Sequence, residues 1–192
     1  KALMRLMDAE IGLGEMLDIK NWMNALIVLL ASGGSTNLVI HLIAMARSAG
    51  YILTIEDFND LSCIIPLICQ VYPNGTADVN EFHSEGGIAR LLSNLMEGDL
   101  IYKDIETVVG FGLESYTKIP YIDEVNAKNL KWKNLAQNQN TKTISTIDNP
   151  FKSNGGIKFI CGDIAEGVIK VSALKDENEI IVAPAKVFLS QE

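Results

Sequence analysis

The sequence predicts an α/β chain that is rich in helices up to about residue 122 and rich in strands after residue 150. Three observations support this prediction. Apolar residues recur at helical spacing in several segments before residue 107. The composition then turns polar after Tyr121, with many Asn, Gln, Thr and Lys residues. Beyond Pro150 the apolar segments are short and β-branched, and Gly, Asp and Asn separate them, which is typical of strands.

The helical part begins with residues 1–17, where apolar side chains recur at helical spacing until Gly12 and Gly14 weaken the pattern. Residues 21–31 form a continuous apolar stretch, and periodicity alone does not decide between a helix and a buried strand. Residues 36–49 predict a buried helix, because most of their side chains are apolar and a glycine follows them.

Shorter helices are expected next. Thr54 and Asp57 stand at the spacing of a capping box and predict the start of a helix that ends near residue 61. Residues 66–71 begin with proline, which favours the first turn of a helix. A Pro-Asn-Gly turn over residues 73–75 separates them from residues 88–97, which predict a helix with one apolar face.

The polar segment of residues 123–150 is interpreted as a connector between two domains. A long span without secondary structure is uncommon inside one compact domain. Residues 1–122 would then belong to a helical domain, and residues 151–192 would begin a β-rich one. Strands are expected in this second part over residues 156–160, 167–173 and 179–183.

Charge and hydropathy exclude two classes of function. The chain carries 16 Lys and Arg against 24 Asp and Glu, a net charge of −8, with no basic run. We therefore expect no nucleic-acid partner. The longest apolar run, residues 25–31, is far shorter than the roughly 20 residues that span a membrane, so no membrane partner is expected either. We expect a cytoplasmic protein.

The three cysteines, Cys63, Cys69 and Cys161, do not have the spacing of a zinc site. An odd number of cysteines suits a reducing compartment. Free cysteines are among the most buried residue types, so we expect all three to pack in the interior.

The sharpest local feature is the run Gly33-Gly34-Ser35-Thr36-Asn37, which leads into a helix that carries His41. Two glycines allow the backbone to approach a ligand, and the first N–H groups of a helix bind anions such as phosphate or carboxylate. The alternative is a tight turn in which Ser35 or Thr36 merely caps the helix. His41 likewise has two interpretations: it contacts a ligand, or it lies in the core with its hydrogen bond made there.

Other polar residues have simpler explanations. His83 lies in a polar stretch before the helix of residues 88–97, and a solvated residue accounts for it. Lys170 lies within residues 168–172, the apolar part of an expected strand, and could reach a ligand, but strand alternation would equally place it in solvent.

The segment from Asn24 to Asn37, with His41-Leu42-Ile43-Ala44 after it, resembles a signature of the dihydroxy-acid/6-phosphogluconate dehydratase family. The motif Val71-Tyr72-Pro73-Asn74-Gly75 resembles the 6-phosphogluconate branch more than the dihydroxy-acid branch. Further segments continue the resemblance over nearly the whole chain: Asp57-Phe58, Ala77-Asp78-Val79-Asn80, Val108 to Leu113, Gly155 to Lys158, Val168 to Ala173 and Ala183 to Phe188.

This resemblance implies a fold and an activity. The fold would be the helix-rich end of an α/β N-terminal domain, followed by the first strands of a β-barrel-like C-terminal domain. The activity would be that of a hydro-lyase that converts 6-phosphogluconate, a sugar-acid phosphate, in the Entner–Doudoroff pathway. The family uses an iron–sulfur cluster, here expected as [4Fe–4S], and related members add Mg²⁺. The full-length enzyme is expected to be a cytoplasmic homo-oligomer.

The chain departs from the family pattern in its chemistry. The cluster cysteines of the family lie in segments that precede this chain, and its proposed catalytic serine lies in a later one. We therefore expect an internal fragment that holds no catalytic or metal-binding residue and is inactive by itself. The residues that match a motif near the family's active site are expected to bind substrate: Gly33, Gly34, Ser35, Thr36, Asn37 and His41.

Two alternatives stay open at this point. The parent protein could be a dihydroxy-acid dehydratase of branched-chain amino-acid synthesis. The chain could also be a non-catalytic remnant that binds sugar phosphate weakly or not at all.

Overall fold

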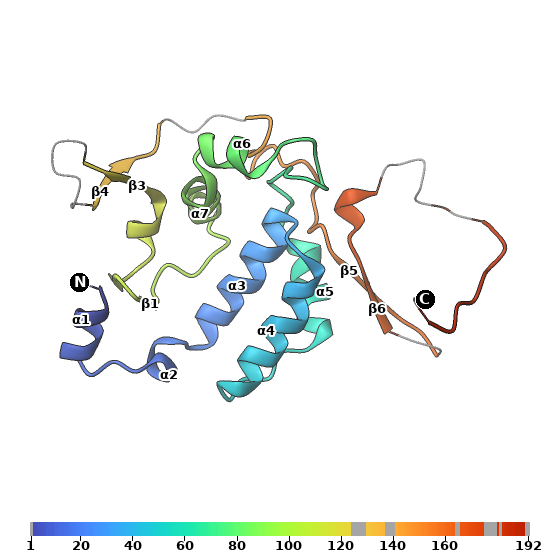
Figure 1. The fold of residues 1–192 in the computed structure, drawn as a ribbon, viewed down its shortest axis with the longest axis horizontal. Helices are drawn as coiled ribbons and strands as arrows, with labels where there is room; N and C mark the ends of the chain where they lie inside the picture. Colours follow the sequence, from blue (N-terminus) through green and yellow to red (C-terminus); the bar gives the residue numbers. More distant parts are fainter. Residues whose placement is uncertain are drawn as a thin grey trace.

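The computed structural model describes residues 2–123, 130–136, 141–163, 166–174, 180 and 182–190. Within these ranges the chain forms seven α-helices (Figure 1): α1 Ala2–Asp8, α2 Leu13–Met16, α3 Ile19–Ser32, α4 Thr36–Ser48, α5 Ile55–Ile64, α6 Val79–Ser84 and α7 Gly87–Glu97. The strands are short: β1 Glu106–Thr107, β2 Gly110–Phe111, β3 Lys118–Ile122, β4 Leu130–Asn134, β5 Lys158–Cys161 and β6 Glu166–Ile169. Two 3₁₀ turns, η1 Glu114–Thr117 and η2 Val171–Ala173, complete the list of elements.

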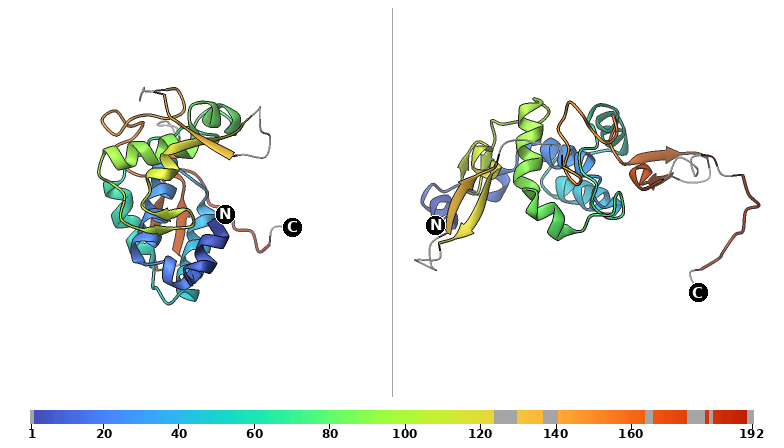
Figure 2. Two further views of the ribbon diagram at one scale, coloured as in Figure 1. Left: turned by 90° about the vertical axis from the view of Figure 1, so that its left-hand side faces the viewer. Right: turned by 90° about the horizontal axis from the view of Figure 1, so that it is seen from above.

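The strands pair only as antiparallel hairpins, β1 with β2, β3 with β4 and β5 with β6. The mixed helix and strand content confirms the predicted α/β class. No barrel closes within the described residues. Seen from above, the molecule is elongated, and residues 182–190 extend away from the helices (Figure 2). Among the described helices, none is long and apolar enough to cross a membrane.

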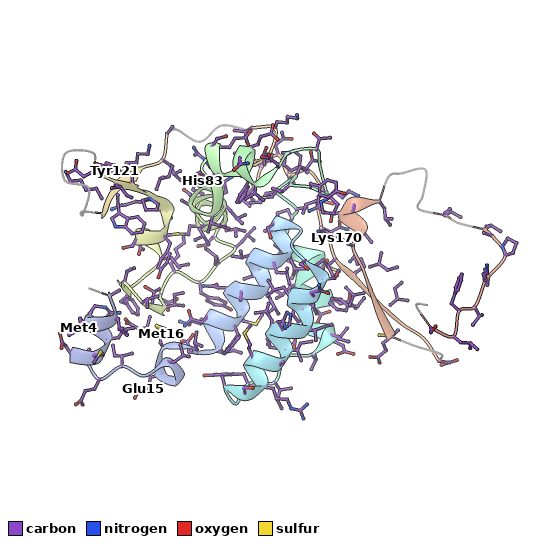
Figure 3. All side chains as sticks on the ribbon, in the orientation of Figure 1. Met4, Glu15, Met16, His83, Tyr121 and Lys170 are labelled. Carbon is purple, nitrogen blue, oxygen red and sulfur yellow. The ribbon has the colours of Figure 1, made fainter. Side chains whose placement is uncertain are left out.

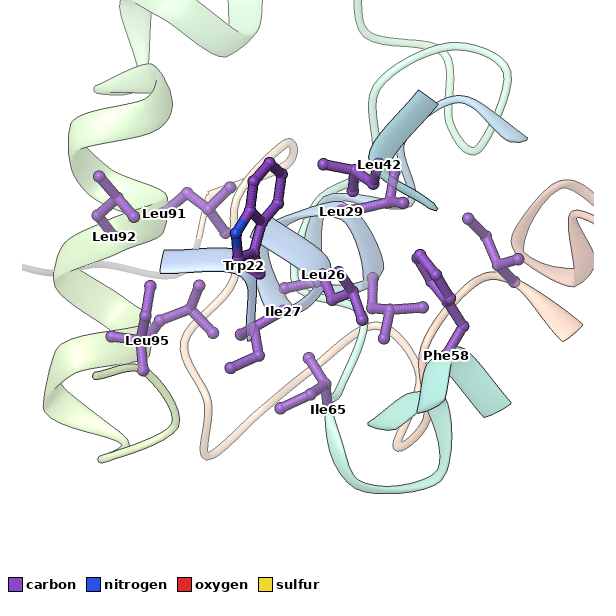
Figure 4. Packing of buried hydrophobic residues seen from close by; sticks show 14 of the residues in the cluster. Trp22, Leu26, Ile27, Leu29, Leu42, Phe58, Ile65, Leu91, Leu92 and Leu95 are labelled. Carbon is purple, nitrogen blue, oxygen red and sulfur yellow. The ribbon is translucent and has the colours of Figure 1, made fainter. Parts of the chain in front are cut away.

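Helix α3 is the centre of the fold and settles the ambiguous stretch of residues 21–31 as a helix. Asp18 caps it by accepting a hydrogen bond from Asn21 N at 3.0 Å, and Gly33 ends it in the left-handed conformation. The helix contacts α4, α5 and α7. Its buried side chains therefore meet those of its neighbours in one core (Figure 4), built around Trp22, Leu26, Ile27, Leu29, Leu30, Phe58, Leu91 and Leu95.

The core supplies most of the stability of these helices, because each is short. Burying one large apolar side chain contributes about 1.5–3 kcal/mol. Isolated helices of fewer than about 12–15 residues are marginal in water. Helix α5, which residues 55–64 form with the expected Thr54–Asp57 capping box, thus depends on the burial of Phe58 as well as on its cap.

Two helix predictions need correction at the N-terminal end. Residues 1–17 do not form one helix, because α1 ends at Asp8 and a second short helix begins at Leu13. Glu10 between them has a φ of 55°, which a continuous helix does not allow. Helix α4 is only half-buried: Val39, Leu42 and Ala46 face the core while its other face is exposed.

The predicted helix over residues 66–71 is wrong. Ile65 precedes Pro66 and is extended, as a residue before proline prefers to be. The backbone that follows forms isolated bridges instead of helical bonds. Its N–H groups donate to distant carbonyls: Leu67 N to Lys152 O, Ile68 N to Ala31 O and Gln70 N to Thr143 O.

The segment of residues 123–150 is more structured than a connector. Its described part contains β4, which pairs with β3 so that Trp132 lies opposite Pro120. Farther on, Ile144 is 1% exposed and forms a bridge with Cys69. The expectation of a span without structure is therefore wrong for the described residues, because apolar side chains, Ile144 among them, anchor the polar segment in the core. A domain division near residues 123–150 stays a prediction.

The C-terminal strands agree only in part with the prediction. Strand β5 overlaps the expected residues 156–160, and β6 covers the start of residues 167–173, whose end is the 3₁₀ turn η2. The third expected strand, residues 179–183, lies partly outside the described residues. Its described members, residues 180, 182 and 183, belong to no strand.

Candidate functional site

The candidate substrate-binding residues lie where α3 meets α4. Gly33, Gly34 and Ser35 join the two helices, Thr36 and Asn37 begin α4, and His41 follows one turn later. Residues 33–37 are called the turn below. Gly33 adopts φ 59°, and Gly34 N donates to Leu29 O at 3.0 Å, which closes the end of α3. Ser35 is extended and caps α4 by accepting a hydrogen bond from Asn37 N at 3.2 Å. The chain thus reverses direction in three residues.

Both glycines are required by close packing. A Cβ atom at Gly33 would lie 2.3 Å from Asn74 Nδ2 and 2.9 Å from Leu67 Cδ1. A Cβ atom at Gly34 would lie 2.6 Å from Leu29 Cδ1. The glycine pair is therefore explained first by the fit of the turn against its neighbours, as the simpler of the two sequence interpretations held.

The polar side chains of the turn face outward. Ser35 and Asn37 are exposed, and Thr36 is half-buried. His41 is exposed one turn farther along α4, on the same side as Asn37, since residues four apart share a helix face. His41 is not a core residue.

The donors at the start of α4 are only partly used. Ser35 occupies the Asn37 N–H, whereas within the described residues neither the Thr36 N–H nor its hydroxyl makes a hydrogen bond. The helix has 13 residues and no acidic residue in its first turn. Its positive end is therefore available to an anion.

Two cavities among the described residues lie away from this turn. One of about 510 Å³ lies between α3, α5 and residues 99–104, and another of about 450 Å³ lies beside the start of α7 and β3. The residues that line them do not include those of the turn. The turn is thus an open surface of this chain, and an enclosed site there would need a further surface to cover it.

Two residues beside the turn, Asn74 and Ser172, have no local signal in the sequence that connects them to it. Asn74 Nδ2 donates to Gly33 O at 2.8 Å, and Ser172 Oγ donates to Asn74 Oδ1 at 2.7 Å. The Pro-Asn-Gly turn was noted, but nothing in the sequence pairs it with residues 98 positions away.

Lys170 and His83 are the other basic residues considered from the sequence (Figure 3). Lys170, at the end of β6, is half-buried, and burial lowers the pKa of its ammonium group. His83 lies exposed in the last turn of α6, as expected for a solvated residue.

The acidic residues after α7 are held in ion pairs. Asp99 accepts from Lys103 at 2.9 Å, and Asp104 pairs with Lys20. These hydrogen bonds are the main reason that the pKa of each carboxyl lies below its usual value. Both carboxylates therefore stay ionised at neutral pH and are poor candidates for proton transfer.

The cysteines do not fit the iron–sulfur cluster that the resemblance implies. Cys69 is buried as expected, but Cys63 and Cys161 are exposed, so the packing prediction is wrong for these two. Burial, aided by Glu85, raises the pKa of Cys69 to about 12, which disfavours the thiolate that binds iron. In the part of the chain that the structure describes, no three His, Cys, Asp or Glu side chains gather to hold a metal ion.

The amino-acid sequence defines the class of protein. The family model for the dihydroxy-acid/6-phosphogluconate dehydratase N-terminal region matches residues 1–116, and the model for the C-terminal region matches residues 142–192. The chain belongs to this family, which confirms the resemblance.

Particular relatives point to one branch. The chain is 42% identical to the phosphogluconate dehydratase of Escherichia coli strain K12 over 180 residues, which cover 93% of the chain and 29% of that relative. It is 43% identical to that of Rhizobium meliloti over 178 residues, with the same coverage. It is 37% identical to a dihydroxy-acid dehydratase of Sulfurisphaera tokodaii over 194 residues, which cover 100% of the chain and 32% of that relative. The chain spans about three tenths of the length of these relatives.

Proposed function

We propose that this chain is part of a hydro-lyase that dehydrates 6-phosphogluconate to 2-dehydro-3-deoxy-6-phosphogluconate. The observation that carries the proposal is the similarity to phosphogluconate dehydratases of several bacteria, at 37–43% identity over at least 93% of the chain. The motif Val71 to Gly75, noted above for its resemblance to the 6-phosphogluconate branch, supports the same assignment.

The test is made with the full-length protein that carries this chain, purified under anaerobic conditions. Formation of the 2-keto product is measured with 6-phosphogluconate and with a 2,3-dihydroxy acid. We expect kcat/KM for 6-phosphogluconate to be higher by at least about a hundredfold, because a site that pairs with phosphate is left with unpaired polar groups by a substrate that lacks it. A preference for the dihydroxy acid would contradict the proposal.

The second candidate is dihydroxy-acid dehydratase activity. It is favoured by the Sulfurisphaera tokodaii relative, which aligns with the whole chain. The same pair of substrates decides between the two, and an absence of turnover with both would favour the non-catalytic remnant.

Within this proposed enzyme, the turn from Gly33 to Asn37 holds an anionic group of the substrate. This role is supported by the positive end of α4, by the exposed Asn37 and His41, and by the Thr36 N–H, which makes no hydrogen bond to any described residue. Thr36→Val keeps the shape and removes the hydroxyl. A charge-assisted hydrogen bond contributes about 1.5–3 kcal/mol, so KM should rise roughly tenfold to a hundredfold.

Ser35→Ala is the companion variant, because Ser35 caps α4 and its loss tests whether the turn has only a structural role. If Thr36→Val folds and leaves KM and kcat unchanged, the hydroxyl of Thr36 does not contact substrate. If Ser35→Ala also leaves KM and kcat unchanged, the hydroxyls of the turn do not bind substrate, and their role is to cap the helix and no more.

The cluster and any Mg²⁺ of the proposed enzyme would take their ligands from residues other than those described here, and the cluster would supply a Lewis acid for the departing hydroxyl. The 192-residue chain by itself should therefore show neither cluster absorbance nor turnover after anaerobic treatment with iron and sulfide. Either signal above a blank would contradict this expectation. We place the enzyme in the cytoplasm as a homo-oligomer, which sedimentation of the full-length protein would test.

A further inference from the structure

The side chain of Asn74 joins the candidate turn to the C-terminal part of the chain. Its Nδ2 donates to Gly33 O at 2.8 Å and lies 3.5 Å from Ser32 O. Its Oδ1 accepts from Ser172 Oγ at 2.7 Å. The nitrogen and the oxygen of the amide therefore both make hydrogen bonds. Because the oxygen accepts from Ser172, the nitrogen faces the turn.

This link is built into close packing on both sides. A Cβ atom added to Gly33 would lie only 2.3 Å from Asn74 Nδ2. A Cβ atom added to Gly156 would lie only 2.5 Å from Ser172 Oγ. Ser172 is only 6% exposed, and its backbone N donates to Gly156 O at 3.1 Å. A side chain added at Gly33 or Gly156 would therefore displace Asn74 or Ser172 from these positions.

The link fixes one peptide group of the turn at both ends. The carbonyl of Gly33 accepts from Asn74, while the N–H of Gly34, in the same peptide, donates to Leu29 O at 3.0 Å. A peptide held at both ends cannot rotate, so the direction in which Ser35 and Thr36 enter α4 is set. The N–H and the hydroxyl of Thr36, neither of which makes a hydrogen bond within the described residues, are thereby held in one place.

We propose that Asn74 and Ser172 are positioning residues for substrate binding by the Gly33–Asn37 turn. This inference rests on the proposed function, because it assumes that the turn meets an anionic group of the substrate. Neither residue touches that group. They act through the peptide that joins Gly33 to Gly34, and through it they couple the C-terminal segment to the binding surface.

The test uses the full-length protein with Asn74→Ala, Ser172→Ala and Ser172→Thr. Ser172→Ala removes one hydroxyl and keeps the backbone, whereas Ser172→Thr keeps the hydroxyl and serves as the matched control. Loss of one such hydrogen bond should raise KM for 6-phosphogluconate by roughly three- to tenfold, with kcat much less affected. Ser172→Thr should stay within about twofold of the wild type.

A double-mutant cycle separates positioning from a general loss of stability. If Asn74 acts through the turn, Asn74→Ala should raise KM much less in a Thr36→Val background than in the wild type. Additive effects on KM would overturn the inference. So would an unchanged KM in both Asn74→Ala and Ser172→Ala.

A second measurement does not depend on activity. Hydrogen exchange at the Gly34 amide, which donates to Leu29 O, should accelerate by about tenfold in Asn74→Ala and Ser172→Ala, and not in Ser172→Thr. Unchanged exchange would overturn the positioning role even in an active enzyme. A wild-type protein that does not turn over 6-phosphogluconate would contradict the proposed function, and exchange would then still decide whether Asn74 orders the turn.

Discussion

The burial of Ile144 differs from what the sequence predicts for its segment and can be tested directly. It lies in a polar segment, yet its side chain is 1% exposed and its backbone bridges the buried Cys69. Ile144→Ala removes three carbon atoms, worth about 0.8 kcal/mol each, and leaves a cavity. We therefore expect the free energy of unfolding to fall by about 3 kcal/mol.

Urea or thermal denaturation of the chain measures this loss. For a protein of this size, 3 kcal/mol corresponds to a decrease in Tm of roughly 6–12 °C. Ile144→Val should cost only about 1 kcal/mol. Ile52→Ala is the matched control, because Ile52 is 83% exposed and its truncation should change stability by less than about 0.5 kcal/mol.

A loss below about 1 kcal/mol for Ile144→Ala would refute the reasoning. It would mean that residues 141–147 do not pack against the core, and that the segment behaves as the open connector that its composition predicts. An equal loss in the Ile52→Ala control would show that the assay does not report burial.

The further predictions concern the cysteines, a helix cap and a half-buried cation. A thiol reagent at pH 8 should modify Cys63 and Cys161 quickly and Cys69 only after unfolding, and rapid reaction of all three would contradict the burial of Cys69. Because the folded pKa of Cys69 is raised to about 12, the unfolded thiol ionises first, so stability should be full below pH 9 and should fall as pH rises above it. Thr54→Ala removes the cap of α5 and should lower the free energy of unfolding by about 1 kcal/mol in urea; no change would show that Asp57 suffices. Lys170→Met should keep or raise stability at pH 7, because burial lowers the pKa of the native ammonium and so disfavours its charge; a clear decrease would contradict this.

Local signals in the sequence account for much of the fold. The Thr54–Asp57 capping box, the Pro-Asn-Gly turn and the glycine pair at residues 33–34 each act within a few residues, and the structure places each where it was expected. The amphipathic spacing of residues 88–97 likewise predicts α7, because an apolar face of that period must be buried. The family motif is also a property of the sequence alone.

The predictions failed where distant partners decide. Residues 66–71 look helical by their proline, but their N–H groups bond to carbonyls of residues 143 and 152, which lie far along the chain. The exposure of one face of α4, and of Cys63 and Cys161, depends equally on which surfaces the rest of the chain covers.

The sequence by itself determined the α/β class, the membership in the dehydratase family and the place of the candidate turn. Capping, turn chemistry and hydrophobic period depend on neighbours within a few residues, so they can be predicted from the sequence without the fold. Only the tertiary structure placed Asn74 between Gly33 and Ser172 and buried Ile144 against Cys69. The contacts of Asn74 join residues 41 and 98 positions apart, and the contact of Ile144 packs a polar segment against the core. No local preference specifies such pairs.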